Sequence, residues 1–479
     1  MLFAAALVAP ACRQQSEGPP KVVVIGGQPK PTDPGLGPLP APDAVLLQNV
    51  AQGLVRFDAS GNIVGGLAER WNVSDDGLSY IFRIAATEWP DGRTITAQQV
   101  ARILKRAIGP RSKNSLRDAL GAVEDIVAMT DRVIEIRLVA PRPNLLPLLA
   151  QPELAILRNG YGTGPFNYSP TGREGGELRL MSEVLSPDDE VTRREEVLLT
   201  GAPATRAIQE FAAARVDLVL GGTSVDLPNV QRVKLPRGSL RFDPASGLFG
   251  LMPLRPGGGL DDPDLRRVLG QAIDRDTFVA VLGVPNLAAR ATVLEPGLDG
   301  ISAPVAPAWI AAPLADRRAA LRAQVDEMFG SGGKPSIRVF LPDGPGSDLL
   351  FRLLERDWGT LGFNVERVLS AAAADLALID EVAPSSSPAW FVRRFHCGAA
   401  PVCDPEADQL IDAARTTLIP AQRYALLAQA AARIDDQHLF IPITAPVRWS
   451  LVARRIEGFA GNRYARHTLT DLEQNPGGP

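Results

Sequence analysis

The chain has few of the side chains that most often carry catalysis or bind transition metals. Its 479 residues include three cysteines and three histidines, and the histidines, at 396, 438 and 467, are scattered. The sequence has no Gly-x-Ser-x-Gly motif and no His/Glu pair with metal-ligand spacing. We therefore expect no enzyme activity, no bound metal and no cofactor. One enzymatic alternative stays open: a glycosidase-like site formed by two carboxylates that meet only in the fold.

Long apolar runs and long basic runs are also missing. No apolar run reaches the ~18 residues that a membrane-spanning helix needs. Of the 50 Lys and Arg residues only six are lysine, and the 50 cations form no long basic run. The chain also has no appended helix-turn-helix segment. We therefore expect no nucleic-acid partner. The net charge of −4 and the hydrophobic fraction of 45% are typical of a globular protein. A length of 479 residues is enough for two large lobes.

The first residues have the pattern of an export signal. Residues 1–11 are apolar and end before Cys12, which is similar to a lipobox, where the cysteine is lipidated and begins the mature chain. The polar residues that follow suit a tether, so we expect 1–20 to be a lipoprotein-type signal and tether. Ala9, Pro10 and the lack of a basic start depart from the usual pattern. This leaves open a start further upstream, or a buried cysteine in an ordinary first helix.

The stretch from 53 to 107 carries the clearest local signals. It predicts a strand at 54–57, one or two helical turns at 67–71, a tight turn at Asp76-Gly77, a strand at 78–84 and a helix at 97–107. The strand at 78–84 is predicted by alternation of apolar and polar residues, and Asp-Gly favours the positive φ angles of a hairpin turn. Thr96 with Gln99 three residues later is a capping box at the helix start.

Several motifs follow one another along the chain: Gly-Leu-Ala-Glu-Arg-Trp at 66–71, Ser-Asp-Asp-Gly-Leu-Ser-Tyr-Ile-Phe-Arg-Ile at 74–84, Trp-Pro-Asp-Gly at 89–92, Gly-Thr-Gly-Pro-Phe at 162–166 and Ala-Ile-Asp-Arg at 272–275. In this order they resemble the extracellular solute-binding proteins of family 5, the peptide, oligopeptide and nickel binders of ABC importers. The resemblance covers most of the chain after the signal segment and is weakest where the family's ligand would lie.

The resemblance implies an α/β fold with two lobes, of the type II periplasmic-binding-protein kind, and an extra small α+β domain on the first lobe. We expect the first lobe at 21–41, 160–246 and 440–479, the small domain at 42–159 and the second lobe at 247–439. The chain would cross between the lobes near 247–254 and 440–448, which would act as hinges. A ligand in the cleft would favour the closed form, because only closure lets it contact both lobes.

Two early segments are expected beside the ligand by this resemblance. Asp33 lies in a Thr-Asp-Pro sequence that looks like the family's Asp-Pro after the first strand. Gly164 and Phe166 belong to the Gly-Thr-Gly-Pro-Phe motif, where the family's chain returns to the first lobe. Glycines permit close backbone approach, although a plain glycine-rich turn would have the same sequence.

The segment after residue 379 departs from the family. Peptide binders of the family carry Trp-x-x-Asp-Tyr before Pro-x-x-Phe, and the Asp neutralises the α-ammonium group of the ligand. Aligned on Pro388 and Phe391, this chain has Glu381 at the place of the Trp and Pro384 at the place of the Asp. Glu381 either replaces the missing carboxylate or is a solvated loop residue. Trp390 offers an aromatic face to a ligand.

Cys397 and Cys403 are separated by five residues that include glycine and proline. In an exported chain this spacing favours a local disulfide, which would contribute ~2 kcal/mol in the chain-entropy estimate. Zinc is the competing interpretation, but only His396 lies nearby.

The function implied by the resemblance is capture of a peptide or peptide-like solute by an extracytoplasmic or periplasmic protein, and delivery to an ABC permease with its ATPase subunits. A non-peptide solute, such as a metal chelate or a sugar, is the alternative on the same scaffold. We expect a monomer whose contact with the membrane, apart from the permease, is a lipid anchor.

Overall fold

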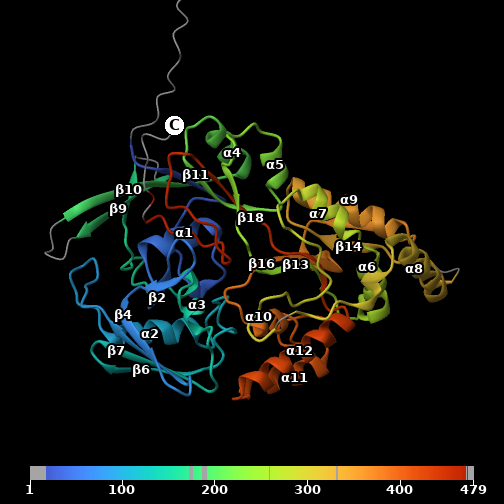
Figure 1. Ribbon diagram of the computed structural model, residues 1–479, viewed down its shortest axis with the longest axis horizontal. Helices are drawn as coiled ribbons and strands as arrows, with labels where there is room; N and C mark the ends of the chain where they lie inside the picture. The colour runs from blue at the N-terminus through green and yellow to red at the C-terminus, as the bar shows by residue number, and fades with distance from the viewer. Residues whose placement is uncertain are drawn as a thin grey trace, which may run out of the picture.

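The computed structural model describes residues 18–171, 176–185, 191–257, 259–301, 303–330, 333–470 and 472. Cys12 and most of the expected signal segment lie outside the described residues. The described chain is organised around a seven-stranded, a five-stranded and a four-stranded sheet, and a separate two-stranded ribbon (Figure 1). No helix in these ranges is both long enough and apolar enough to cross a bilayer.

The seven-stranded sheet draws its strands from three distant parts of the chain. Its order is β12 (Leu240–Phe242), β18 (Arg448–Val452), β11 (Leu218–Thr223), β1 (Lys21–Ile25), β10 (Val191–Ala202), β9 (Glu177–Leu185) and β8 (Asn167–Thr171). The central strand β1 runs parallel to both β10 and β11, so it is paired on both edges. This explains why its sequence is a continuous β-branched run.

Alternate residues of β1 face opposite layers of the molecule. Val22 and Val24 pack in one core with α1 (Ala41–Val50), whereas Val23 packs in another with α4 (Ala204–Ala212) and α5 (Leu227–Gln231). Such alternation follows from the two-residue period of a strand. Because α1 covers the seven-stranded sheet, the expected start of the small domain at residue 42 is wrong, since α1 belongs with the first lobe.

The small α+β unit is built on an antiparallel sheet. The strand order of this sheet is β4 (Ala68–Val73), β5 (Ser79–Ile84), β7 (Val133–Leu138) and β6 (Val123–Thr130). The separate ribbon pairs β2 (Val55–Phe57) with β3 (Ile63–Gly65). Two helices, α2 (Ala97–Ile108) and α3 (Leu145–Leu149), pack in the same hydrophobic core. The capping box of Thr96 and Gln99 is present at the start of α2. Gly77 has φ 68° at the predicted turn.

The predicted helical turns at 67–71 are wrong, because this segment forms most of β4. The Asp76-Gly77 turn brings it back against β5, and residues 68–73 pair with that strand in an antiparallel register. Pairing satisfies the backbone groups of a segment too short to make a stable helix by itself. Tertiary pairing therefore overrode the local pattern.

The five-stranded sheet forms the second lobe. Its order is β15 (Val365–Val368), β14 (Ile337–Phe340), β16 (Leu376–Val382), β13 (Gly247–Pro253) and β17 (Ile441–Thr444). One face packs on α6 (Pro263–Ala272), α7 (Arg275–Leu282), α8 (Leu314–Phe329) and α9 (Pro345–Gly359). The other face packs on α10 (Pro388–Arg393), α11 (Pro405–Thr416) and α12 (Pro420–Asp436), which lie together in Figure 1.

The chain passes between the two large sheets at two short segments, 243–246 and 445–447. Residues 441–444 were expected in the first lobe, but β17 pairs with β13 of the second. That expectation is wrong. The first crossing precedes the predicted 247–254, which is almost wholly β13, and the second is shorter than the predicted 440–448. An ion pair at 2.7 Å links Arg448 of β18 to Asp380 of β16, and Gly346 N–H donates to the Val225 carbonyl at 2.8 Å. The two lobes are therefore in direct contact.

Short 3-10 helices complete the described chain: η1 (Pro34–Leu36), η2 (Pro152–Leu154), η3 (Gly259–Asp261), η4 (Ala308–Ala311) and η5 (Ala371–Ala373).

Between α10 and α11, Cys397 and Cys403 are joined by a disulfide, as predicted, with their Cα atoms 5.1 Å apart. No group of three or more His, Cys, Asp or Glu side chains in the described ranges is arranged to hold a metal ion.

Candidate functional site

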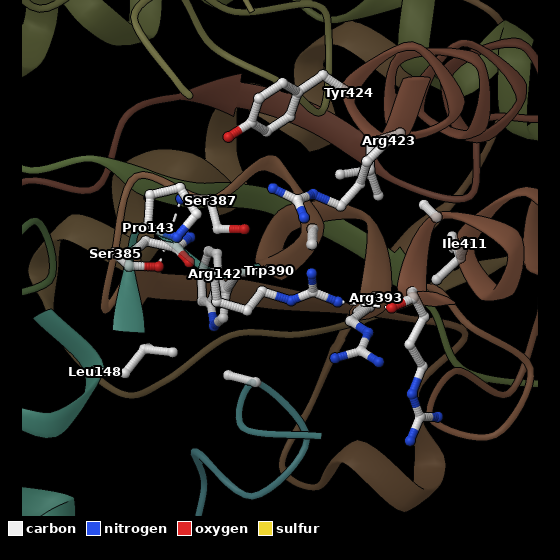
Figure 2. A pocket seen from close by; sticks show the side chains of 16 residues that line it. Arg142, Pro143, Leu148, Ser385, Ser387, Trp390, Arg393, Ile411, Arg423 and Tyr424 are labelled. Atoms are coloured by element: carbon white, nitrogen blue, oxygen red, sulfur yellow. Dashed lines mark hydrogen bonds between the residues drawn. The ribbon is translucent and has the colours of Figure 1, made fainter. Parts of the chain in front are cut away.

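A small pocket lies where the small α+β unit meets the second lobe. Its interior is about 40 Å³. From the small unit it is lined by Ala119, Arg142, Pro143, Asn144 and Leu148, and from the second lobe by Ser385, Ser387, Ala389, Trp390, Arg393, Ile411, Ala414, Arg415, Arg423, Tyr424 and Leu427 (Figure 2). Because neither part encloses the pocket alone, it exists only while the two parts are together.

The small unit presents its side of the pocket on the turn between β7 and α3. The hydroxyl of Tyr80 donates to the carbonyl of Arg142 at 2.8 Å and fixes this turn against β5. Two prolines, Pro141 and Pro143, flank Arg142 and restrict the backbone there. The turn therefore holds the Arg142 side chain toward the second lobe.

The second lobe presents its side on three helix ends. Arg393 lies in the last turn of α10, Arg415 in the last turn of α11, and Arg423 in the first turns of α12. Cations in the last turn of a helix interact favourably with the partial negative charge of the helix dipole, which suits Arg393 and Arg415. Figure 2 shows Arg142, Arg393 and Arg423 entering the same region from different elements.

Hydrogen bonds from these arginines cross the boundary between the two parts. Arg393 donates to the carbonyl of Asp118 at 2.5 Å, Arg423 to that of Pro141 at 2.5 Å, and Arg415 to that of Gly121 at 3.2 Å. In the opposite direction, Arg142 donates to the carbonyl of Arg415 at 2.7 Å. Each acceptor is a neutral backbone carbonyl, so these bonds join the parts without neutralising the charges.

Burial and the unneutralised charges together lower the pKa values of two of these arginines. Burial, together with the positive charges of Arg423, Arg393 and Arg415, lowers the pKa of Arg142 to about 10. Burial likewise lowers the pKa of Arg393, with a further contribution from Arg415. In the part of the chain that the structure describes, none of the four guanidinium groups forms an ion pair with a carboxylate.

Two acidic side chains stand near this cluster and are engaged elsewhere. The Asp118 carboxylate pairs with Arg117 at 3.2 Å and is largely exposed. The Asp412 carboxylate lies 3.5 Å from His396. Without pairing with an arginine of the pocket, both still act on Arg393, because their negative charges raise its pKa and offset part of the effect of burial.

The segment after β16 contributes to the pocket in a different way from that predicted. Trp390 lines it, with its ring edge-to-face against Phe391 at 5.0 Å between centroids. Glu381 does not line it, and its carboxylate pairs with Arg394 at 2.7 Å. The Pro384 carbonyl accepts a hydrogen bond from the Gln151 side chain at 3.0 Å, which ties this segment to the first lobe and small unit.

The three other predicted ligand residues lie away from this pocket. Asp33 caps η1 by accepting from Gly35 N–H at 2.8 Å, and it lines a separate groove of about 700 Å³ beside α2. Gly164 packs against the end of α1, where an added Cβ would lie 2.5 Å from a Val50 backbone atom. Phe166 is 2% exposed and belongs to the core of the seven-stranded sheet.

Sequence reasoning missed the four arginines. None of them stands in a recognisable motif of this arginine-rich chain, and Arg142 and Arg415 are 273 residues apart. The one local signal was the Pro-Arg-Pro sequence at 141–143, which restricts the backbone around Arg142.

The comparisons with known proteins agree with this architecture. The family described as bacterial extracellular solute-binding proteins, family 5 middle, matches residues 62–372, which is more than half of the chain. A probable di/tripeptide-binding protein 5 of Pseudomonas aeruginosa is 22% identical over 488 aligned residues, covering 87% of this chain and 88% of that protein.

Two solved structures share the fold. The Haemophilus influenzae OppA complex with RPPGFSPFR has a TM-score of 0.83 at 16% identity, covering 96% of this chain and 99% of that one. NikA from Brucella suis in complex with Fe(III)-EDTA has a TM-score of 0.75 at 16% identity, covering 95% and 100%. On the extent of the family match and this shared two-lobed fold, the chain belongs to the bacterial extracellular solute-binding proteins of family 5.

Proposed function

We propose that the chain captures a peptide or peptide-like solute outside the cytoplasm and delivers it to the permease of an ABC importer. The observation that carries the proposal is the pocket whose two walls come from the small unit and the second lobe. A site divided in this way binds most tightly when the walls meet, so a solute shifts the protein toward its closed form. The closed form is then the form that the permease recognises.

The peptide class is supported by the relative from Pseudomonas aeruginosa, whose alignment spans most of both chains. It is also supported by the likeness of fold to an OppA complex with a peptide. The permease and its ATPase subunits are the implied partners, and the chain acts as a monomer. The chain has no catalytic role in transport, because the family is one of binding proteins.

A non-peptide solute is the second candidate, and one feature of the site favours it. The pocket has no acidic lining residue, and the nearby Glu381 is paired with Arg394, so no carboxylate there would meet a peptide's α-ammonium group. The likeness of fold to NikA with Fe(III)-EDTA is compatible with this alternative. Both candidates share the same mechanism of closure.

Lipid anchoring through Cys12 belongs to the same proposal. An anchored binding protein would stay close to its permease, and the polar tether after Cys12 would let it move between them. Metabolic labelling with a palmitate analogue should mark the wild type and leave Cys12→Ala unlabelled. Equal labelling of both proteins would contradict the anchor and leave the transport function unaffected.

Native mass spectrometry and small-angle X-ray scattering together test the function. The full chain purified from the periplasm should carry a small molecule, identified by its mass. After this molecule is removed, pooled di- and tripeptides should lower the radius of gyration as the lobes close. A chain that carries no solute, and whose radius of gyration responds to neither peptides nor other small solutes, would refute the proposal.

A further inference from the structure

We propose that Arg142, Arg393, Arg415 and Arg423 form an anion site that binds a carboxylate group of the transported solute when the small unit closes on the second lobe. The inference rests on the proposed function and deepens it by naming the chemistry that the solute must carry.

The first argument is charge. Four cations line one pocket of about 40 Å³, and no lining residue is acidic. Natural proteins rarely bury arginine without an acidic partner, because an unbalanced buried charge is costly. Arg423 is only 5% exposed, and yet it bonds to a carbonyl and to no carboxylate of the described chain. Asp118 and Asp412 offset part of the charge at Arg393 from outside the pocket, and the remaining negative charge is expected from the ligand.

The second argument is the number of free donors. A guanidinium group carries five N–H donors. Arg142 uses its two terminal nitrogens for the carbonyls of Pro141 and Arg415, at 2.9 and 2.7 Å, and each of the other three makes one bond across the boundary. Several N–H groups around the pocket thus remain available in the described structure. A carboxylate could take two of them from one arginine in the parallel geometry that favours Arg over Lys.

The third argument is the origin of the charges. Three of the arginines belong to the second lobe, and Arg142 belongs to the small unit. Closure brings Arg142 against three like charges, which opposes the closed form. An anion between them would offset this repulsion and would contact both walls. Closure is therefore coupled to the presence of the anion, and a neutral solute of the same shape would close the protein less well.

The size and lining of the pocket select a carboxylate. A water molecule needs roughly 10–15 Å³ of such volume, so the pocket admits a group of a few atoms. Trp390, Leu148 and Leu427 give the pocket an apolar wall for the carbon atoms next to the charge. A peptide can supply the group from its C-terminus or from a Glu or Asp side chain, and a non-peptide acid can supply it as well.

The experiment is isothermal titration calorimetry on the ligand-stripped full chain with four probes. These are pooled tripeptides with a free C-terminal carboxylate, the same pool amidated at the C-terminus, an amidated pool containing glutamate, and glutarate. Wild type is compared with Arg142→Gln, with Arg142→Lys, and with Arg206→Gln as a matched control on the exposed face of α4. Thermal melting verifies that each variant is folded.

We expect Arg142→Gln to weaken binding of at least one carboxylate probe by about ten- to a hundredfold, since a hydrogen bond to a charged group is lost. Arg142→Lys keeps the charge but not the parallel pair of donors, so it should recover only part of the affinity lost in Arg142→Gln, and Arg206→Gln should match the wild type. The amidated pool without glutamate, which carries no carboxylate, should bind weakly to all four proteins. Comparing the pool with a free C-terminus to the amidated pool containing glutamate distinguishes binding of a C-terminal carboxylate from binding of a side-chain carboxylate. Binding of glutarate tests whether the site accepts a non-peptide acid.

Other outcomes overturn the proposal. If Arg142→Gln weakens the amidated pool without glutamate and the carboxylate pools equally, the arginines only latch the closed form. If that amidated pool binds wild type as tightly as the carboxylate probes, the carboxylate inference fails while solute capture stands. If no carboxylate probe binds, the anion site is refuted. If glutarate binds in an Arg142-dependent way and the peptides do not, the site stands and the peptide class fails.

Discussion

Asp435 offers a sharp test of how burial changes the charge of a carboxyl group in the second lobe. It lies in the last turn of α12, and its carboxyl oxygen accepts a hydrogen bond from Val293 N–H at 2.8 Å. Burial raises the pKa of this carboxyl from 3.8 to about 8, because removal from water disfavours the charged form, and the bond from Val293 opposes the shift in part. Asp435→Asn keeps an acceptor oxygen for Val293 and removes the titrating proton.

The direction and size of the effect follow from proton linkage. Between about pH 4 and about pH 8 the folded chain keeps a proton on Asp435 that the unfolded chain releases, so the free energy of unfolding falls as the pH rises. One such proton is worth about 1.4 kcal/mol per pH unit, or ~4 kcal/mol between about pH 4 and about pH 7. Since the residue as a whole is only partly buried, water relieves some of this cost. We expect about half, ~2 kcal/mol, at neutral pH.

Urea unfolding across this pH range measures the difference between Asp435→Asn and the wild type. The difference should be near zero at the acid end and should grow to ~2 kcal/mol in favour of the variant at neutral pH. Asp436→Asn, at the exposed neighbouring position, is the matched control and should show no such growth. A difference that does not change with pH, or a variant less stable than the wild type at neutral pH, would refute the reasoning.

Three further predictions concern residues singled out from the sequence. Gly164→Ala should lower the free energy of unfolding by ~1–3 kcal/mol in urea titrations, because the new Cβ would clash with α1. Gly176→Ala is the control and should be nearly neutral, because nothing lies within 4 Å of the new Cβ. Equal losses of unfolding free energy in the two variants would contradict the packing argument. Glu381→Gln should cost under ~1 kcal/mol, because its ion pair with Arg394 is 41% exposed on each side chain; a tenfold loss of solute affinity by calorimetry would instead place Glu381 in contact with the ligand. Non-reducing peptide mapping of periplasmic protein should find Cys397 linked to Cys403, and two freely alkylated thiols would contradict this.

Local features of the sequence determined much of the secondary structure. The capping box at Thr96 and the turn at Gly77 need only neighbouring residues, and both are present as predicted. The alternating pattern of β5 is set by which face is buried, and the strand occurs within one residue of its predicted bounds of 78–84. The order of motifs predicted the family, which the match over 62–372 establishes.

Pairing between strands decided the features that local patterns could not. The segment at 67–71 became part of β4 because β5, the next strand of the same hairpin, satisfied its backbone. Residues 441–444 joined the second lobe because they pair with β13, which is far away along the chain. Backbone hydrogen bonding between strands has no side-chain signature that fixes which strand a segment will choose.

The candidate site depended most on tertiary structure. The sequence drew attention to the segment after β16, and Trp390 from that segment does line the pocket. It could not predict that Phe166 would be buried, or that Arg142 would meet arginines from three helices of the other lobe. A single arginine looks the same in sequence whether it is solvated or buried. Only the fold determines which charges share a cavity and which of them lack a partner, because electrostatic energy depends on distance in space and not on separation along the chain.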